Sequence, residues 1–361
     1  MLHAISWDRV IYDEAHHLRN RNTAQYIGAT HLRTEHTWLV TGTPMQNSKA
    51  DLKSLADLVG VGRDTLVGKR MLRRTKEQAG VQLPSIASSK TGVAWKSHEE
   101  MQLAEKVHSL YDGFHTKSTR VSSTISFQSK EESPDKPASG EHLVLLTRCR
   151  QVCVLPQLLA KSMQYSTRDN ATTEDRQSEQ DFYARALSAS SRLDHVADHL
   201  LYHPSPENDA AQGSRRKIVF CNYRGEMDFL HQKLTNTSYH GLRVGVVDGR
   251  TNTKTRRDHM RNSDILLLQI QTSCEGLNLQ HFQDVYFVSP HWNPFVEAQA
   301  IGRCHRIGQT REVRVFRFFM DGSSFRPSDD RAECAPLTAD NYIQEKQSAK
   351  RDLADEILSA Q

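Results

Sequence analysis

The sequence has no apolar run long enough to cross a membrane as a helix, which excludes the class of helical membrane proteins. Its N-terminus lacks a basic region followed by an apolar core, so we expect no signal peptide. The six cysteines include no C-x-x-C pair and no two ligand pairs with zinc spacing. We therefore expect reduced cysteines in an intracellular protein, and no zinc. A net charge of only +4 does not by itself specify an anionic partner.

What the sequence contains is typical of a folded α/β protein. Its 361 residues are enough for two domains, and 37% hydrophobic with 25% charged residues is an ordinary globular composition. Two regions alternate apolar strand-like runs with helical patterns, which indicates buried parallel strands. In the first region we expect strands at Arg9–Tyr12 and Thr37–Thr41 and helices at Thr23–Leu32 and Ala50–Val59.

The second region begins near Ser191 and has the same alternating pattern. Its last helix, expected from about 340 to 358, carries Leu353 and Ile357 as an apolar i,i+4 pair that suits docking on a core. The expected strands are Ile218–Phe220, Arg243–Val247, Asp264–Leu268, Val285–Val288 and Val313–Phe319, and the other expected helices are Glu226–Leu234 and Val296–Arg306.

Polar stretches separate these patterned regions. Residues 117–141 are rich in Ser, Lys, Glu and Pro, and we expect them to form a flexible insertion. Residues 142–160 have a helical pattern, 166–181 are polar and expected to be loose, and a polar break lies at 203–216. A further polar insertion, 322–337, precedes the last helix.

The first motif with chemical content is Asp13-Glu14-Ala15-His16, directly after the first expected strand. A carboxylate at the end of a strand can hold the hydration shell of a magnesium ion, and the next one can orient or deprotonate water. The residues alone leave two alternatives open. The four side chains could be ordinary turn residues, or Asp13, His16 and His17 could belong to a metal-dependent hydrolase.

A second motif, Leu39-Val40-Thr41-Gly42-Thr43-Pro44, places two hydroxyls around a glycine at the end of the next expected strand. The proline prevents the strand from continuing. One helix separates this strand from the first, so we expect the two strands to be parallel neighbours whose ends lie side by side. Thr41 and Thr43 would then be close to the carboxylates of the first motif. The alternative is a simple turn between a strand and a helix.

A third motif runs from Gln299 to Arg306 and reads QAIGRCHR. On a helix, Gln299, Arg303 and Arg306 fall at positions i, i+4 and i+7 and share one face. Two guanidinium groups on one face suit phosphate oxygens whose charge grows in a transition state. A solvated basic face is the alternative, and the preceding Pro290–Pro294, which reads PHWNP, argues against it.

The order of these motifs resembles that of a known family. DEAH is followed by TGTPMQN, KIVFCNY, VVDGRT, EGLNL, PHWNP and QAIGRCHRIGQ. This order is similar to the SWI/SNF-type branch of the superfamily-two helicase-like ATPases, and the resemblance covers nearly the whole chain outside the polar insertions. The terminal Asn341–Leu358 also resembles the helix that braces the second lobe in that family.

The resemblance implies two RecA-like α/β lobes that bind ATP and Mg²⁺ between them and double-stranded DNA across both. Such proteins translocate on duplex DNA without separating its strands, act in the nucleus, and serve chromatin remodelling or DNA repair on DNA-bound proteins. By resemblance, the catalytic residues are Glu14, Arg303 and Arg306. The same resemblance implies that Asp13, His16, Gly276 and Gln299 bind ATP and that Asp13 holds magnesium through water. It also implies that the residues for coupling or DNA contact are Thr41, Thr43, Asp248, Gly249, Asn278 and Trp292.

The sequence departs from the family pattern at two places that matter for ATP. No G-x-G-K-[ST] phosphate loop is present. The stretch Gly62–Arg70 resembles one, but it has five residues between its glycines and an arginine where a Ser or Thr must meet magnesium. In addition, Ser273-Cys274 stands where the family usually has paired glycines, which alters a tight backbone approach.

The sequence therefore predicts the C-terminal part of a DNA-dependent ATPase with a truncated first lobe. Such a lobe would expose apolar surface and an unpaired sheet edge. Two alternatives are a short protein that binds DNA or a partner without hydrolysis, and one half of a site that another chain completes. The expected domains are a partial first lobe with the start of a helical protrusion at 1–116, the insertion at 117–141, a helical segment and linker at 142–189, a complete second lobe at 190–321, and an insertion with the brace helix at 322–361.

Overall fold

The computed structural model describes residues 2–46, 48–62, 65–76, 78–111, 125–127, 139–165, 173–203, 214–236, 241–273, 277–322 and 338–358. The chain forms two compact units. Unit 1 consists of Met1–Gln82, Trp292–Ala298 and Glu345–Gln361, and unit 2 consists of Leu83–His291 and Gln299–Gln344. None of the helices in the described residues is both long and apolar enough to span a membrane.

Unit 1 contains two parallel strands, β1 (Ser6–Tyr12) and β2 (Arg33–Leu39), in a two-stranded sheet. The chain between them forms a short 3-10 helix, η2 (Ala15–Arg19), and the helix α1 (Ala24–Thr30). The predicted parallel pairing of neighbouring strands is confirmed. The second strand ends at Leu39, before the threonines that the sequence placed at its end. The last backbone hydrogen bond from this strand to β1 runs from Val40 N–H to Tyr12 O, and the chain then turns away from β1.

The helix α2 (Lys49–Leu58) begins with a capping box formed by Ser48 and Asp51. Its apolar side packs under the sheet in a core cluster of Ala15, Leu55, Ala56 and Leu66, to which Tyr12 and Leu39 contribute from the strands. A second cluster joins Met45 and Leu52 to Ala354, Leu353 and Ile357 of the C-terminal helix. The expected docking pair Leu353 and Ile357 therefore packs in unit 1.

The other face of the β1–β2 sheet is open in the described residues. Ile11 and Trp38, which are partners in the strand register, are 57% and 56% exposed. The guanidinium carbon of Arg9 lies 5.5 Å from the centre of the Trp38 ring, which covers part of this surface with a charged group. Apolar surface is therefore exposed on this face in the described residues.

Unit 2 is built on a six-stranded sheet in the order β3-β10-β9-β6-β8-β7, and all its neighbouring strands are parallel. The central strands are buried on both faces, as the continuous apolar runs Ile218–Phe220 and Leu266–Leu268 predicted. The strands are β3 (Ile86–Val93), β6 (Lys217–Cys221), β7 (Val244–Val247), β8 (Ile265–Gln269), β9 (Asp284–Phe287) and β10 (Val313–Met320).

The edge strand β3 differs from the sequence prediction, which grouped residues 83–116 with the first lobe. In the structure the described part of this stretch, residues 83–111, belongs to unit 2, and β3 pairs with β10 over its whole length. Its sequence, IASSKTGV, has no apolar run. At this sheet edge only the side chain of Val93 is buried, so the other positions need not be apolar. A strand that buries one side chain has no periodicity that a sequence reading can detect.

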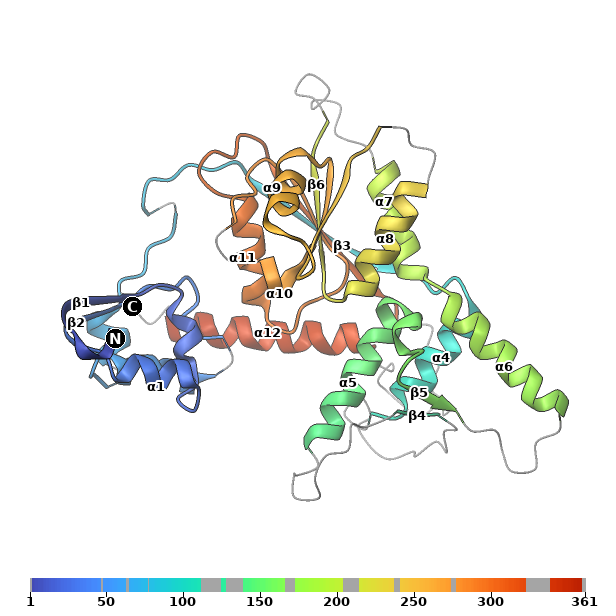
Figure 1. The fold of residues 1–361 in the computed structure, drawn as a ribbon, viewed down its shortest axis with the longest axis horizontal. Helices are drawn as coiled ribbons and strands as arrows, with labels where there is room; N and C mark the ends of the chain where they lie inside the picture. The colour runs from blue at the N-terminus through green and yellow to red at the C-terminus, as the bar shows by residue number, and fades with distance from the viewer. Residues whose placement is uncertain are drawn as a thin grey trace. The chain divides into compact units, whose positions relative to one another are not determined.

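Helices cover both sides of this sheet. In Figure 1, α7 (Ser191–Tyr202) and α8 (Arg224–Asn236) lie together on one side, and α9 (Thr253–Asn262) and α10 (Ile270–Ser273) lie on the other. Two helices contribute to both units: α11 (Pro294–Cys304) and α12 (Ala339–Leu358). The predicted brace helix thus exists, and only its beginning, up to Gln344, belongs to unit 2.

A helical region of unit 2 contains α4 (His98–His108), α5 (Ser139–Val154) and α6 (Thr173–Ser188), with a short antiparallel pair of β4 (Ile125–Phe127) and β5 (Met163–Tyr165). The prediction of a loose 166–181 is wrong from residue 173 onward, because α6 buries Tyr183 and Ala186 further along the same helix. Of the predicted flexible insertion at 117–141, only Ile125–Phe127 and the start of α5 are described. The predicted insertion at 322–337, apart from its first residue, and most of the break at 203–216 lie outside the described residues.

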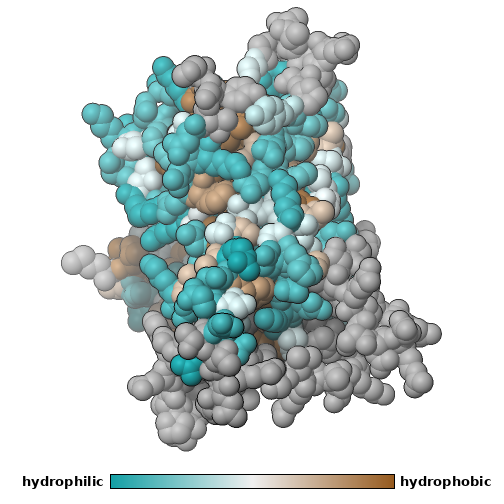
Figure 2. Space-filling view, turned by 90° about the vertical axis from the view of Figure 1, so that its right-hand side faces the viewer, coloured by the Kyte–Doolittle hydropathy of each residue, from teal (hydrophilic) through white to brown (hydrophobic). Residues whose placement is uncertain are grey.

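The face of the molecule drawn in Figure 2 has the mainly hydrophilic surface expected when most apolar residues are buried. In Figure 2 hydrophilic residues predominate, and the hydrophobic ones occur in small, separated groups. The large apolar side chains that remain more than half exposed in the described residues are Leu2, Ile11, Trp38, Leu72, Leu143, Tyr202 and Ile307.

The face of α7 that packs on the sheet carries a half-buried histidine, His199, whose Nδ1 lies 3.2 Å from Tyr286 Oη. Its ring lies 4.9 Å from that of Phe316 between centroids. Burial, followed by the charges of His203 and His195, lowers the pKa of His199 to about 4. The protonated ring is therefore disfavoured in the folded chain.

This low pKa predicts a specific loss of stability in acid. In the unfolded chain His199 has an ordinary pKa near 6.5, so the unfolded chain binds more protons between about pH 6.5 and pH 4. Stability contributed by this group is present above pH 6.5 and is lost as the pH falls through that window. Relative to wild type, His199→Phe should gain about 1–2 kcal/mol between pH 7 and pH 4.5, because partial exposure screens the full shift. Urea unfolding at both pH values measures this gain, and a pH-independent difference would contradict it.

Candidate functional site

Asp13 and Glu14 lie directly after β1, where the sequence placed them. Asp13 is exposed, and its Oδ1 accepts the backbone N–H of Glu14 at 2.9 Å. Glu14 has the left-handed backbone conformation (φ 48°, ψ 45°) and is the one non-glycine residue with positive φ among the described residues. This conformation costs about 1–2 kcal/mol for a residue with a Cβ. Such strain at a polar residue motivates a functional hypothesis.

The side chain of Glu14 contacts His16 of its own motif, and His16 in turn contacts the next motif. His16 is buried, and its Nδ1 lies 3.3 Å from Glu14 Oε2 and 3.1 Å from Thr41 Oγ1. The backbone supports the same junction, because Ala15 N–H donates to Val40 O at 3.0 Å. The predicted meeting of the two strand ends is therefore observed, and the histidine is the group that joins them.

A line of polar contacts continues from Thr41 through unit 1. The backbone N–H of Thr43 donates to Thr41 Oγ1 at 3.1 Å, and Gln46 Nε2 donates to Thr43 Oγ1 at 3.3 Å. Gln46 Oε1 then accepts Asn293 Nδ2 at 3.2 Å. Gln46 and Asn293 are both buried, at 5% and 9% exposure. This line reaches from Glu14 to the segment that carries Trp292.

Sequence reasoning did not single out Gln46 and Asn293 as site residues. Gln46 lies in the motif TGTPMQN and Asn293 in PHWNP. The motifs therefore marked both segments as functional but did not identify these two residues within them. Trp292 itself is half-buried, and its carbonyl accepts Lys350 Nζ of α12 at 3.3 Å. The segment 292–298 is thus fixed to unit 1 by side chains that are far from it in sequence.

The arginine motif is arranged differently from its prediction. Gln299 and Arg303 lie on α11 and are half-buried, but α11 ends at Cys304. Arg306 is exposed and lies beyond the helix, so the predicted three-residue stripe is wrong at its last member. In the turn beyond the helix, Gly308 has φ 98°, and a Cβ there would lie 2.8 Å from Gln280 Oε1.

Asp248 and Gly249 follow β7 and shape the turn into α9. Asp248 accepts the backbone N–H of Arg250 at 2.8 Å and its Nε at 2.7 Å. Burial raises the pKa of Asp248, but these hydrogen bonds from Arg250 and the charge of its guanidinium outweigh burial, and the net pKa is lowered. A Cβ on Gly249 would come within 3.2 Å of Arg224 Nη2. Asn278 is exposed, and Gly276 lies outside the described residues.

The oxygen donors of unit 1 fit the group that the first motif implies. Mg²⁺ prefers carboxylate oxygens and water, and Asp13 and Glu14 supply two carboxylates at one strand end, Asp13 being exposed. The alternative of a metal hydrolase through Asp13, His16 and His17 gains no geometric support, because these three do not form a cluster of ligand atoms in the described residues. A different exposed group does, since ligand atoms of Asp8, Glu35 and His36 lie within 4.8 Å of one another.

Comparison with known protein families gives two matches along the chain. Residues 1–63 match the SNF2-related domain, and residues 195–308 match the helicase conserved C-terminal domain. The parallel α/β sheet of unit 2 and the helicase conserved C-terminal domain that lies in it are consistent with a RecA-like lobe. The SNF2-related domain that precedes it is consistent with a SWI/SNF-type helicase-like chain.

Individual curated proteins show the same relationship at low identity. The chain is 25% identical over 373 residues to "TATA-binding protein-associated factor mot1" of Aspergillus fumigatus, covering 90% of this chain and 19% of that protein. It is 26% identical over 348 residues to "Probable global transactivator" of Orgyia pseudotsugata multicapsid polyhedrosis virus, covering 87% and 62%. It is 28% identical over 349 residues to mouse "Chromodomain-helicase-DNA-binding protein 9", covering 92% and 12%.

The chain thus spans less than two thirds of the length of each of these relatives. Among solved structures, the chain is similar to "Crystal structure of the C-terminal part of Fun30 ATPase domain". The identity is 15% and the TM-score 0.45, covering 76% of this chain and 97% of that one.

Proposed function

We propose that this chain acts in ATP-dependent translocation on double-stranded DNA, with ATP hydrolysis coupled to movement, as a SWI/SNF-type remodeller. ATP use, commonly with Mg²⁺, is supported by the matches to the SNF2-related and helicase C-terminal domains. The observation that carries the proposal for this chain is the arrangement around Glu14. Its carboxylate lies at a strand end on a strained backbone and contacts His16, whose ring also contacts Thr41. Such positioning is expected of a general base and serves no evident packing purpose.

In this proposal Glu14 accepts a proton from the attacking water, and His16 fixes the carboxylate in the orientation that this transfer needs. Asp13, which is exposed beside it, would hold Mg²⁺ through water, and the ion would supply neutralisation of phosphate charge. Arg303 and Arg306 would stabilise charge on the transferred phosphoryl group. His16, Gly276 and Gln299 would contact the nucleotide.

The same proposal assigns coupling and DNA contacts to a second set of residues. Thr41 and Thr43 lie in the chain of polar contacts that runs from Glu14 to Asn293. A change in the position of the carboxylate can therefore shift the segment 292–298. The remaining members of the set are Asp248, Gly249, Asn278 and Trp292. Action on chromatin or another DNA-bound protein in the nucleus is proposed from the family alone.

The absence of a G-x-G-K-[ST] motif from the sequence gives a second candidate function. Without backbone N–H groups that cradle the phosphates, the carboxylates of unit 1 have no bound substrate to act on. The chain would then be a DNA- or partner-binding fragment that does not hydrolyse ATP. A third possibility, a half-site completed in trans, needs another polypeptide to bring the phosphate-binding loop.

Phosphate release by the purified chain, with and without duplex DNA, distinguishes these candidates. The proposed function predicts DNA-stimulated turnover, either alone or after adding a polypeptide that carries the phosphate-binding loop. Salt-sensitive binding of duplex DNA with no turnover in any of these mixtures would contradict hydrolysis and favour the binding fragment. Turnover only in the mixture would establish completion in trans.

A further inference from the structure

The outer face of α9 carries a row of basic side chains that the proposed site does not use. Lys254, Arg257 and Arg261 are exposed and stand at positions i, i+3 and i+7 of one helix, so they form one stripe along its surface. We call these three residues the basic stripe. The helix has no buried residue at all, which is unusual for a helix that covers a sheet.

The orientation of this helix is fixed by contacts on its inner face. His259 Nδ1 lies 2.8 Å from Val246 O of β7, and the helix begins with Asn252 Oδ1 accepting the N–H of Thr255 at 2.9 Å. Close approach depends on Gly245, where a Cβ would lie 2.1 Å from Ser263 Oγ and 2.9 Å from His259 Cβ. The polar backbone contacts hold α9 against the strand, and the basic stripe therefore faces away from the sheet.

No side chain of the basic stripe forms an ion pair within the part of the chain that the structure describes. By contrast, the neighbouring Arg250 is bonded to both Asp228 and Asp248. The acidic residue on the same outer face, Asp258, accepts Asn262 Nδ2 at 2.6 Å. The stripe therefore places three exposed cations along one helix face, which suits an anionic partner.

The spacing of these cations fits a row of phosphates. Seven residues of α-helix span about 10 Å, and one strand of duplex DNA presents a phosphate about every 3.4 Å along the axis. We propose that the basic stripe of α9 contacts the phosphate backbone of double-stranded DNA as an auxiliary surface, separate from the residues assigned to hydrolysis and coupling. This inference rests on duplex DNA being the substrate in the proposed function and names a surface of unit 2 that holds it. The contacts are with phosphates, so no sequence preference is expected from them.

The test measures DNA affinity without nucleotide, so its outcome is independent of ATP turnover. The full chain binds a fluorescently labelled 30-base-pair duplex in an anisotropy titration at several salt concentrations from 50 to 200 mM KCl. The test variant replaces the basic stripe (Lys254→Gln, Arg257→Gln and Arg261→Gln). The charge-matched control replaces three exposed basic residues on other elements of unit 2 (Lys90→Gln, Lys161→Gln and Arg176→Gln). Circular dichroism confirms that both variants are folded.

We expect the stripe variant to bind the duplex roughly tenfold to a hundredfold more weakly at low salt, with the slope of log K against log salt reduced by about 3. The control variant should keep the wild-type slope within about 1. Equal losses in both variants would show a general charge effect and overturn the proposal. It is likewise overturned if the stripe variant keeps wild-type affinity, if wild type does not bind duplex DNA, or if an acidic polyglutamate peptide depends on the stripe while the duplex does not.

Discussion

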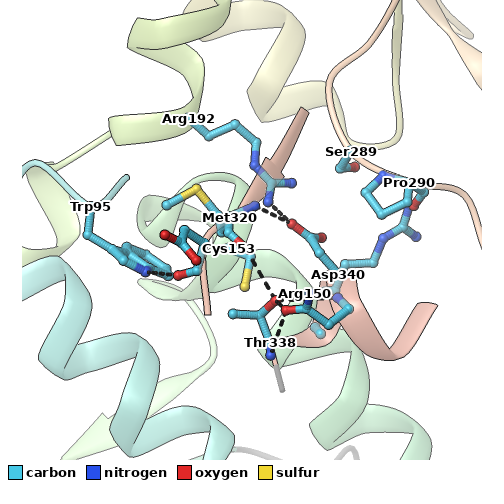
Figure 3. A network of polar contacts seen from close by, with 12 residues as sticks. Trp95, Arg150, Cys153, Arg192, Ser289, Pro290, Met320, Thr338 and Asp340 are labelled. Carbon is cyan, nitrogen blue, oxygen red and sulfur yellow. Dashed lines mark hydrogen bonds and ion pairs between the residues drawn. The ribbon is translucent and has the colours of Figure 1, made fainter. Parts of the chain in front are cut away.

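Replacing Arg192 with methionine is expected to destabilise the folded chain by about 3–5 kcal/mol, because it leaves a buried carboxylate without its cation. Arg192 in α7 pairs with Asp340, in the first turn of α12, and both side chains are completely buried. Asp340 also accepts the backbone N–H of Met320, at the end of β10, at 2.8 Å. Figure 3 shows Arg192 and Asp340 pointing toward each other beside Met320. The carboxylate thus joins three elements of unit 2.

The network is incompletely satisfied even in the native chain. Arg192 Nε and Nη1 and Asp340 Oδ1 are buried without a hydrogen-bond partner in the described residues. Such a pair stabilises little relative to apolar residues of the same volume, but it is costly to break on one side. The double variant Arg192→Met with Asp340→Leu should therefore be more stable than Arg192→Met alone, despite the loss of the bond to Met320.

Urea unfolding followed by circular dichroism measures these differences. The matched control is Arg185→Met, because Arg185 pairs with Glu99 at 3.0 Å on the surface, where its own side chain is 60% exposed. That pair should contribute no more than about 1 kcal/mol. A loss below about 1 kcal/mol for Arg192→Met would show that the buried pair does not hold α12 to unit 2, contrary to our expectation.

A second large effect is expected from Glu14→Gln. In any reaction where the chain hydrolyses ATP, alone or with an added phosphate-binding loop, this change should reduce turnover by about 10²–10⁴-fold. The amide keeps the size of the side chain and the left-handed backbone of residue 14 but cannot accept a proton from water. The expected loss is in kcat, with nucleotide affinity largely kept, since the interaction removed acts in the transition state.

Glu35→Gln is the matched control for this measurement. Glu35 is an exposed glutamate on β2, in the same unit, and the proposal gives it no role in hydrolysis. Unchanged turnover in Glu14→Gln would contradict the assignment of the base, whereas equal losses in both variants would indicate a general electrostatic effect. Glu14→Gly adds a structural readout. It should relieve the strain of the left-handed conformation, worth about 1 kcal/mol, while also abolishing turnover.

Much of the candidate site could be predicted from sequence because it consists of short motifs at strand ends. The strand pattern before Asp13 and the turn at Thr43-Pro44 placed both motifs at the same sheet edge, and the pairing of β1 with β2 brought Thr41 to His16. Arg306 was misplaced, because helical spacing alone does not reveal that α11 ends at Cys304. Gln46 and Asn293 were missed because they are joined by a hydrogen bond across 247 residues of sequence.

The sequence by itself determined the α/β architecture, the order of the motifs and the buried central strands of unit 2. These are local properties, encoded in periods of two and 3.6 residues and in short motifs. Only the tertiary structure decided that β3 joins the sheet of unit 2, that Leu353 and Ile357 pack in unit 1, and that the basic side chains of α9 lack ion-pair partners in the described residues. An edge strand with one buried residue has no periodic signal, and the partner of an apolar or charged face depends on residues distant in the chain. Such contacts are set by packing in three dimensions, which local pattern does not record.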